Sequence, residues 1–130
     1  MEFKVSSATI ERTGLLLVSV EGELDIATAA RLEEPAEVAV SVGCPLVLDL
    51  SECSFIDSTG LRSVLHTHRV LLEVGEPMAL VSDGSQVRRM LSVTGIDLSV
   101  RVFATRDEAI AWLGTGGARV SEQAQALSPV

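Results

Sequence analysis

Aromatic residues are scarce in this sequence. They make up 3% of its 130 residues, with one Trp and no Tyr, whereas hydrophobic residues make up 47%. The core must therefore be aliphatic, and there is little aromatic surface on which the bases of single-stranded nucleic acid could stack. A chain of this length is long enough for one domain and too short for two well-filled cores.

Positive charge is also in short supply. Ten Lys and Arg stand against 18 Asp and Glu, which gives a formal net charge of −8. An acidic protein repels nucleic-acid phosphates and anionic lipid headgroups, so the composition disfavours both kinds of partner. Much of the acidity falls within residues 21–37, where Arg31 is the only basic residue. That stretch is either a solvated face or a patch that meets a basic partner surface.

Long apolar runs are missing, and cysteines are few. No run approaches the ~20 apolar residues that a membrane-spanning helix needs, and residues 1–10 lack the pattern of a secretory signal. Cys44 and Cys53 flank the apolar run 46–50. If that run is a strand it holds them about 17 Å apart, at ~3.3 Å per residue, which is too far for a disulfide unless the flanking residues fold back. We therefore expect a reduced, cytoplasmic protein.

The periodicity of the apolar residues predicts the order β-β-α-β-α-β-α-β-α. We expect strands over 3–10, 15–20, 46–50, 78–81 and 100–103, and helices over 26–42, 58–74, 87–94 and 105–113. Pro35 should kink or divide the first helix near Glu34. This order predicts an α/β fold with a mixed, mostly parallel β-sheet of about five strands, packed by about four helices.

Periodicity ends at Gly114. The remaining residues are rich in Gly, Ser, Ala and Gln. We therefore predict one domain over residues 1–113 and a flexible C-terminal tail over residues 114–130.

The most informative local motif is Asp57-Ser58-Thr59-Gly60. It follows the apolar run 46–50 and begins the amphipathic helix 58–74. In open α/β sheets, ligands and partners are usually met at the carboxyl edge of the strands. Either Asp57 or Ser58 can cap the helix, so one interpretation is a good helix start and nothing more. Capping needs one such residue, however, and here three polar residues stand together beside a Gly.

The sequence argues against catalysis at this motif. A G-x-S-x-G nucleophile elbow would need Gly where Ile56 stands, and an aspartic protease would need a second carboxylate motif. Both histidines, His66 and His68, lie beyond the first turn of the helix that Ser58 begins, so neither is a suitable base. They also point to nearly opposite helix faces and cannot hold one metal ion together. With Lys4 as the only Lys, there is no phosphate-binding loop. We expect no enzymatic activity, no metal and no cofactor.

Three segments together resemble one known family. They are Gly22-Glu23-Leu24-Asp25 with Thr28-Ala29, the run from Leu48 through Asp57-Ser58-Thr59-Gly60-Leu61, and residues 87–96. This combination resembles the anti-sigma factor antagonists, which are stand-alone STAS domains, and so implies a STAS-like fold and a role in bacterial transcription regulation.

The resemblance implies a phosphorylation switch and names its partners. In that family, a partner that is both anti-sigma factor and Ser kinase, a histidine-kinase-like ATPase, phosphorylates the Ser of this motif. The unphosphorylated form binds that partner and releases the sigma factor, and a Ser phosphatase resets the cycle. Here the phosphorylated residue would be Ser58. The partner-binding residues around it would be Asp25, Asp57, Ser58, Thr59, Gly60 and Leu61.

Two other functions remain open from the sequence. One is a STAS-like sensor or scaffold module in a stress-signalling assembly, binding a small ligand or a protein without a sigma factor. The other is the cytoplasmic domain of an anion transporter, which we disfavour because no membrane segment precedes the domain.

Overall fold

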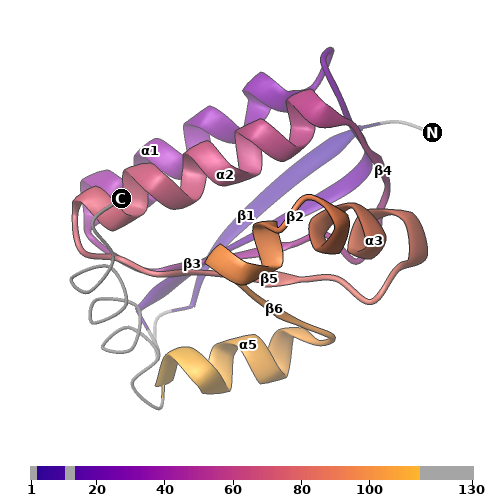
Figure 1. Cartoon of the computed structure of the whole chain (residues 1–130). Helices are drawn as coiled ribbons and strands as arrows, with labels where there is room; N and C mark the ends of the chain where they lie inside the picture. Colours follow the sequence, from indigo (N-terminus) through magenta and orange to yellow (C-terminus); the bar gives the residue numbers. More distant parts are fainter. Residues whose placement is uncertain (1–2, 11–13, 115–130) are drawn as a thin grey trace.

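The protein, described here by a computed structural model over residues 3–10 and 14–114, is built around one β-sheet (Figure 1). Within these residues the sheet has six strands in the order β1-β2-β3-β5-β6, with β4 paired to β2. The strands are β1 (Lys4–Ile10), β2 (Leu15–Leu24), β3 (Leu46–Asp49), β4 (Cys53–Ile56), β5 (Met78–Val81) and β6 (Arg101–Phe103). β1 runs antiparallel to β2, and the other pairings are parallel. The predicted mixed, mostly parallel α/β fold is confirmed.

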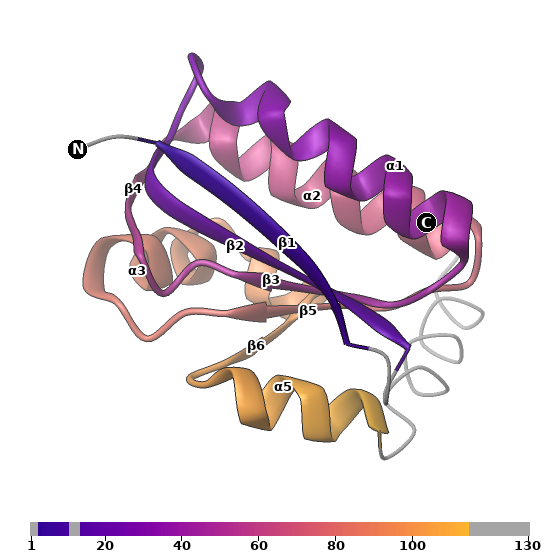
Figure 2. The ribbon, with the colours of Figure 1, turned by 180° about the vertical axis from the view of Figure 1, so that it is seen from behind.

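Helices cover both faces of the sheet. They are the 3-10 helix η1 (Ala29–Leu32) and the α-helices α1 (Glu33–Val42), α2 (Ser58–Glu73), α3 (Ser85–Val93), α4 (Ile96–Ser99) and α5 (Arg106–Trp112). Helices α1 and α2 lie side by side on one face, whereas α5 lies on the opposite face, as both views show (Figures 1 and 2).

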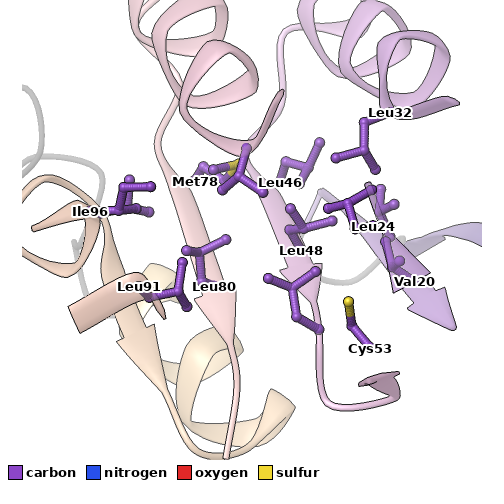
Figure 3. Close-up of a cluster of buried hydrophobic side chains, with 14 of the residues drawn as sticks. Val20, Leu24, Leu32, Leu46, Leu48, Cys53, Met78, Leu80, Leu91 and Ile96 are labelled. Atoms are coloured by element: carbon purple, nitrogen blue, oxygen red, sulfur yellow. The ribbon is translucent and has the colours of Figure 1, made fainter. Parts of the chain in front are cut away.

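The core lies mainly between the sheet and α1 to α4. All four residues of β3 and of β5 are buried, as expected for strands covered on both faces. Alternate side chains of these strands, such as Leu46 and Leu48, point into the larger cluster, which Figure 3 shows in close-up. Val47 and Ala79 point the other way, into a smaller cluster with α5. The core is thus aliphatic, as the composition predicted.

The first predicted helix begins later than expected. Residues 25–28 form a loop, η1 follows, and α1 starts at Glu33. Pro35 is the third residue of α1, in the first turn, where a backbone N–H has no partner within the helix. The predicted helix is therefore divided between η1 and α1, at Glu33, two residues before Pro35 and next to the predicted point at Glu34.

Strand β4 was not predicted. Its sequence is Cys-Ser-Phe-Ile, and only its first and last residues are buried. Four residues with two buried positions carry too weak a periodicity to mark a strand. As a result, the Asp57-Ser58-Thr59-Gly60 motif follows β4 and not, as expected, the buried strand β3.

The two cysteines are free and buried. Burial raises the pKa of both thiols above the ordinary value, which disfavours the reactive thiolate. Within residues 3–10 and 14–114, no helix combines the length and the apolar character needed to cross a membrane. The predicted tail over 114–130 lies, from residue 115 onward, outside the described residues, so the boundary at residue 113 stays a prediction.

Candidate functional site

Asp57 joins three segments at the carboxyl edge of the sheet. It is the N-cap of α2 and has an extended backbone. Its Oδ1 accepts a hydrogen bond from the Gly60 N–H at 2.9 Å, and its Oδ2 accepts one from the Ile26 N–H at 3.3 Å. Its own N–H donates to the Leu24 carbonyl at 3.2 Å. One carboxylate therefore caps α2 and ties it to the loop that follows β2.

That loop, residues 25–28, is held by its own polar side chains. The Asp25 Oδ1 accepts a hydrogen bond from the Ala27 N–H at 3.0 Å. The Thr28 hydroxyl accepts one from the Asp25 N–H at 3.0 Å and donates to the Glu23 carbonyl at 2.8 Å. The structure thus brings the predicted site residues Asp25 and Asp57 to the same edge, although they are far apart in the sequence.

Gly60 allows α2 to approach the end of β2 closely. A Cβ at this position would lie 2.2 Å from the Leu24 carbonyl oxygen and 2.8 Å from the Ile56 Cγ1. No side chain fits in that space, so the sequence needs glycine here for packing. Gly60 and Leu61 are both buried and lie behind the surface that Ser58 presents.

Ser58 is exposed at the first position of α2. Its hydroxyl makes no hydrogen bond to any of the residues that the structure describes, because Asp57 supplies the cap. The first N–H groups of a helix lack partners within the helix and carry the positive end of its dipole. The neighbouring Thr59 is half-buried. The arrangement presents the exposed Ser58 hydroxyl at a helix start, where added negative charge is tolerated.

Neither histidine is placed to act as a base for Ser58. His66 and His68 lie about 12 and 15 Å along α2, at 1.5 Å per residue. His66 is exposed, while His68 is buried and its pKa is lowered by burial and by the nearby Arg69. Over the described part of the chain, no cluster of three or more His, Cys, Asp or Glu side chains could hold a metal ion.

Gln86 supports the site from α3, a role that no pattern in the sequence indicates. Its Oε1 accepts a hydrogen bond from the Ile56 N–H at 3.0 Å, and its Nε2 donates to the Ile56 carbonyl at 3.1 Å. The side chain thereby completes the pairing of β4 immediately before Asp57. In the sequence, Gln86 is a polar residue near the start of a helix, a pattern typical of a solvated position.

Comparison with known proteins points to one family. The family model of the STAS domain matches residues 6–109. The anti-sigma-F factor antagonist RsfB of Mycobacterium tuberculosis (strain H37Rv) is 32% identical over 119 residues, which cover 89% of this chain and 93% of RsfB.

Two solved structures show the same architecture. The crystal structure of an anti-sigma factor antagonist from Mycobacterium paratuberculosis aligns with a TM-score of 0.76 at 29% identity, covering 86% of this chain and 94% of that one. The Bacillus cell fate determinant SpoIIAA aligns with a TM-score of 0.60 at 24% identity, covering 85% and 97%. The likeness to SpoIIAA is one of fold.

Proposed function

We propose that this chain, which belongs to the STAS domain family, is an anti-sigma factor antagonist switched by phosphorylation of Ser58. With Ser58 unphosphorylated, it binds an anti-sigma factor that is also a Ser kinase, and the sigma factor is released. Phosphorylation of Ser58 by that partner ends the binding, and a Ser phosphatase restores it. The curated relative RsfB, named an anti-sigma-F factor antagonist, supports this role.

The observation that carries the proposal is the division of roles between Asp57 and Ser58. Asp57 makes the cap to Gly60 and the bond to the loop at Ile26. Ser58 is exposed and takes part in neither. A phosphoryl group can therefore be added to Ser58 without breaking any contact that holds α2 in place.

The switch acts through charge and bulk at the surface. A phosphoryl group adds about −1.5 to −2 charges. The start of α2 tolerates this charge, because its free N–H groups and dipole favour anions. A partner surface matched to a small hydroxyl beside Asp57 would be blocked by the group and repelled if it is acidic. The fold persists while the binding is lost.

The phosphoryl transfer needs a base from the kinase. The Ser58 Oγ attacks the γ-phosphorus of ATP held by the kinase, the bond to the leaving ADP breaks, and the hydroxyl proton goes to the base. Because both histidines of this chain lie far along α2 from Ser58, we assign that base to the partner. The antagonist is in this respect a substrate and a binding module.

The remaining predicted contact residues take different parts in the proposed interface. Asp25, Asp57 and Thr59 are half-buried and in this proposal would touch the partner together with Ser58. Gly60 and Leu61 are buried, so they would act by setting the position of the first turn of α2.

Phosphorylation by the kinase of the same genome tests this function. The purified protein is incubated with that kinase and ATP, and the modified peptide is mapped by mass spectrometry. We expect one phosphoryl group, on Ser58. Ser58→Ala should abolish it, whereas the matched loss of the adjacent hydroxyl in Thr59→Ala should not. Phosphorylation of Thr59, or of neither residue, would contradict the proposal.

A further inference from the structure

A groove between α1 and α2 begins beside the proposed switch. It has a volume of about 780 Å³ and follows the two helices, which lie side by side (Figure 1). The Ser63 hydroxyl donates to the Ala29 carbonyl at 2.9 Å and joins α2 to η1, the 3-10 helix that precedes α1. Six of its fourteen lining residues are Ala, Val or Ile, namely Ile26, Ala29, Ala30, Ala36, Val40 and Val70.

The two rims of the groove carry opposite charge. Glu33 and Glu37 line it on α1, one helical turn apart, and Arg62 and His66 line it on α2, also one turn apart. All four side chains are exposed. Among the described residues none of the four forms an ion pair, the one pair there being Arg106 with Asp49. The two carboxylates and the Arg62 guanidinium are therefore available to a partner.

We propose that this groove binds an amphipathic helix of the anti-sigma factor kinase, an inference that rests on the function proposed above. The apolar stripe of that helix would lie on the aliphatic floor. Its basic side chains would face Glu33 and Glu37, and its acidic ones would face Arg62. This is the helix-in-groove mode, in which an apolar helix face is recognised by a groove of matching length and polarity.

The shape and charge of the groove favour a helix over a small ligand. Small-molecule sites enclose most of the ligand surface, whereas this groove lies between two helices with exposed side chains on both rims. The net charge of −8 and the acidic stretch over 21–37 would attract a basic segment and guide its approach. The sequence left this stretch as either a solvated face or a patch for a basic partner, and the groove favours the patch.

The position of the groove connects it to Ser58. Thr59 and Ile26 line the end nearest the switch, and Ile26 is 80% exposed, so its apolar side chain is open to a partner there. A phosphoryl group on Ser58 would stand at that end. The seated helix and the unmodified hydroxyl would then form one continuous contact surface, so that a single modification disturbs it.

Two single charge reversals on α1 distinguish an effect of the groove on binding from a general effect of the protein's net charge. Glu37→Lys changes the rim, and Glu34→Lys makes the same change at an exposed position of α1 that does not line the groove. Affinity for the purified kinase is measured by calorimetric titration, with circular dichroism as a folding control. We expect Glu37→Lys to weaken binding about tenfold and Glu34→Lys to change it less than about threefold. Ala30→Trp, which fills the groove from an exposed position, should weaken binding at least as much as Glu37→Lys.

The outcomes distinguish this inference from the function on which it rests. If Glu37→Lys, Glu34→Lys and Ala30→Trp all bind as the wild type does while Ser58→Asp does not bind, the groove proposal is overturned and the switch stands. If the wild type does not bind the kinase, both are overturned. Self-association in sedimentation that Glu37→Lys abolishes would assign the groove to a second copy. A tenfold gain in affinity on replacing Val120 and Leu127 by Ser would assign it to residues 115–130. Either result overturns the inference.

Discussion

At the scale of single residues, two neighbours in the site have different roles: Asp57 holds the start of α2 in place, and Ser58 is the residue proposed to be phosphorylated. Asp57 uses both carboxylate oxygens, one for Gly60 and one for Ile26. If Ser58 were the cap, its hydroxyl would be occupied by a backbone N–H, and phosphorylation would remove that bond. Because Asp57 is the cap, Ser58 is left exposed. Two of the three adjacent polar residues of the motif thus have separate places, Asp57 in the cap and Ser58 at the surface.

Replacing Gly60 by Ala should be strongly destabilising, although alanine is ordinarily the better helix former. The new Cβ would meet the Leu24 carbonyl oxygen at 2.2 Å, a backbone atom that cannot rotate away. We expect the free energy of unfolding to fall by about 3 kcal/mol or more, at the upper end of the range for overpacking. Urea unfolding gives the value.

Gly84→Ala is the control for this substitution. Nothing lies within 4 Å of a Cβ at that position, and its φ of −80° suits any residue. The loss there should be about 1 kcal/mol or less, the cost of a poorer N-cap for α3. Equal losses for the two variants would contradict the close approach of α2 to β2.

Asp49 should make the free energy of unfolding depend on pH in the acid range. It is 3% exposed, and its side chain accepts hydrogen bonds from the Ser51 N–H at 2.9 Å and from the Arg106 Nε. Burial alone would raise the pKa of this carboxyl, but the bonds from Ser51 and Arg106 outweigh it and hold the pKa below the ordinary 3.8. A carboxyl with a lowered pKa in the folded state stabilises the fold above its unfolded pKa and loses that contribution as the pH falls through the folded value.

The free energy of unfolding should therefore decrease as the pH falls below about 4, and Asp49→Asn should flatten that part of the profile. The pKa of the buried His68 is also lowered. The protein therefore loses the stabilising contribution of neutral His68 in a separate, less acidic range, which begins as the pH falls below 6.5. His68 is present in both proteins, so their difference isolates Asp49. Parallel profiles for the two proteins would show that Asp49 does not have the predicted role.

At the scale of elements, the long and strongly patterned segments were predicted well. The helix expected over 58–74 is α2, Ser58–Glu73, and the strand expected over 78–81 is β5, Met78–Val81. Both have a clear apolar period and a marked beginning or end. β4 and the late start of α1 were missed, because each depends on contacts that a local pattern does not contain. The bond from Ile26 to Asp57 and the bonds from Gln86 to Ile56 join residues that are 31 and 30 positions apart.

The same distinction applies to the site. The motif itself, its place at the start of α2 and the nearness of Asp25 were expected from the residues and from the family resemblance. The packing role of Gly60, the second bond of Asp57 and the groove beside Thr59 depend on how β2, α1 and α2 pack together. No spacing in the sequence reports that packing.

Gln86→Leu should destabilise the edge of the sheet that supports the switch. It leaves the N–H and the carbonyl of the buried Ile56 without the two bonds from the side chain. We expect a loss of about 1–3 kcal/mol and faster hydrogen exchange at the Ile56 amide. Arg88→Leu, at an exposed position of the same helix, should leave that amide unchanged. Unaltered exchange at Ile56 in Gln86→Leu would rule out this support.

At the scale of the whole molecule, the switch lies apart from the core. The buried clusters lie between the sheet and its helices, and Ser58 belongs to neither. An added charge at Ser58 therefore meets solvent and the start of a helix and does not meet packed aliphatic side chains. The proposed regulation would therefore take place at the surface, with the fold unchanged.

The affinities of Ser58→Ala and Ser58→Asp for the purified anti-sigma factor kinase test this account most directly. Both variants keep the Asp57 cap and should remain folded by circular dichroism. Ser58→Ala removes one hydroxyl and should bind as the wild type does. Ser58→Asp places an unpaired carboxylate at the interface and should bind at least about tenfold more weakly, or about 1.4 kcal/mol. Equal affinity of the two folded variants in calorimetric titration would contradict a phosphorylation switch at Ser58.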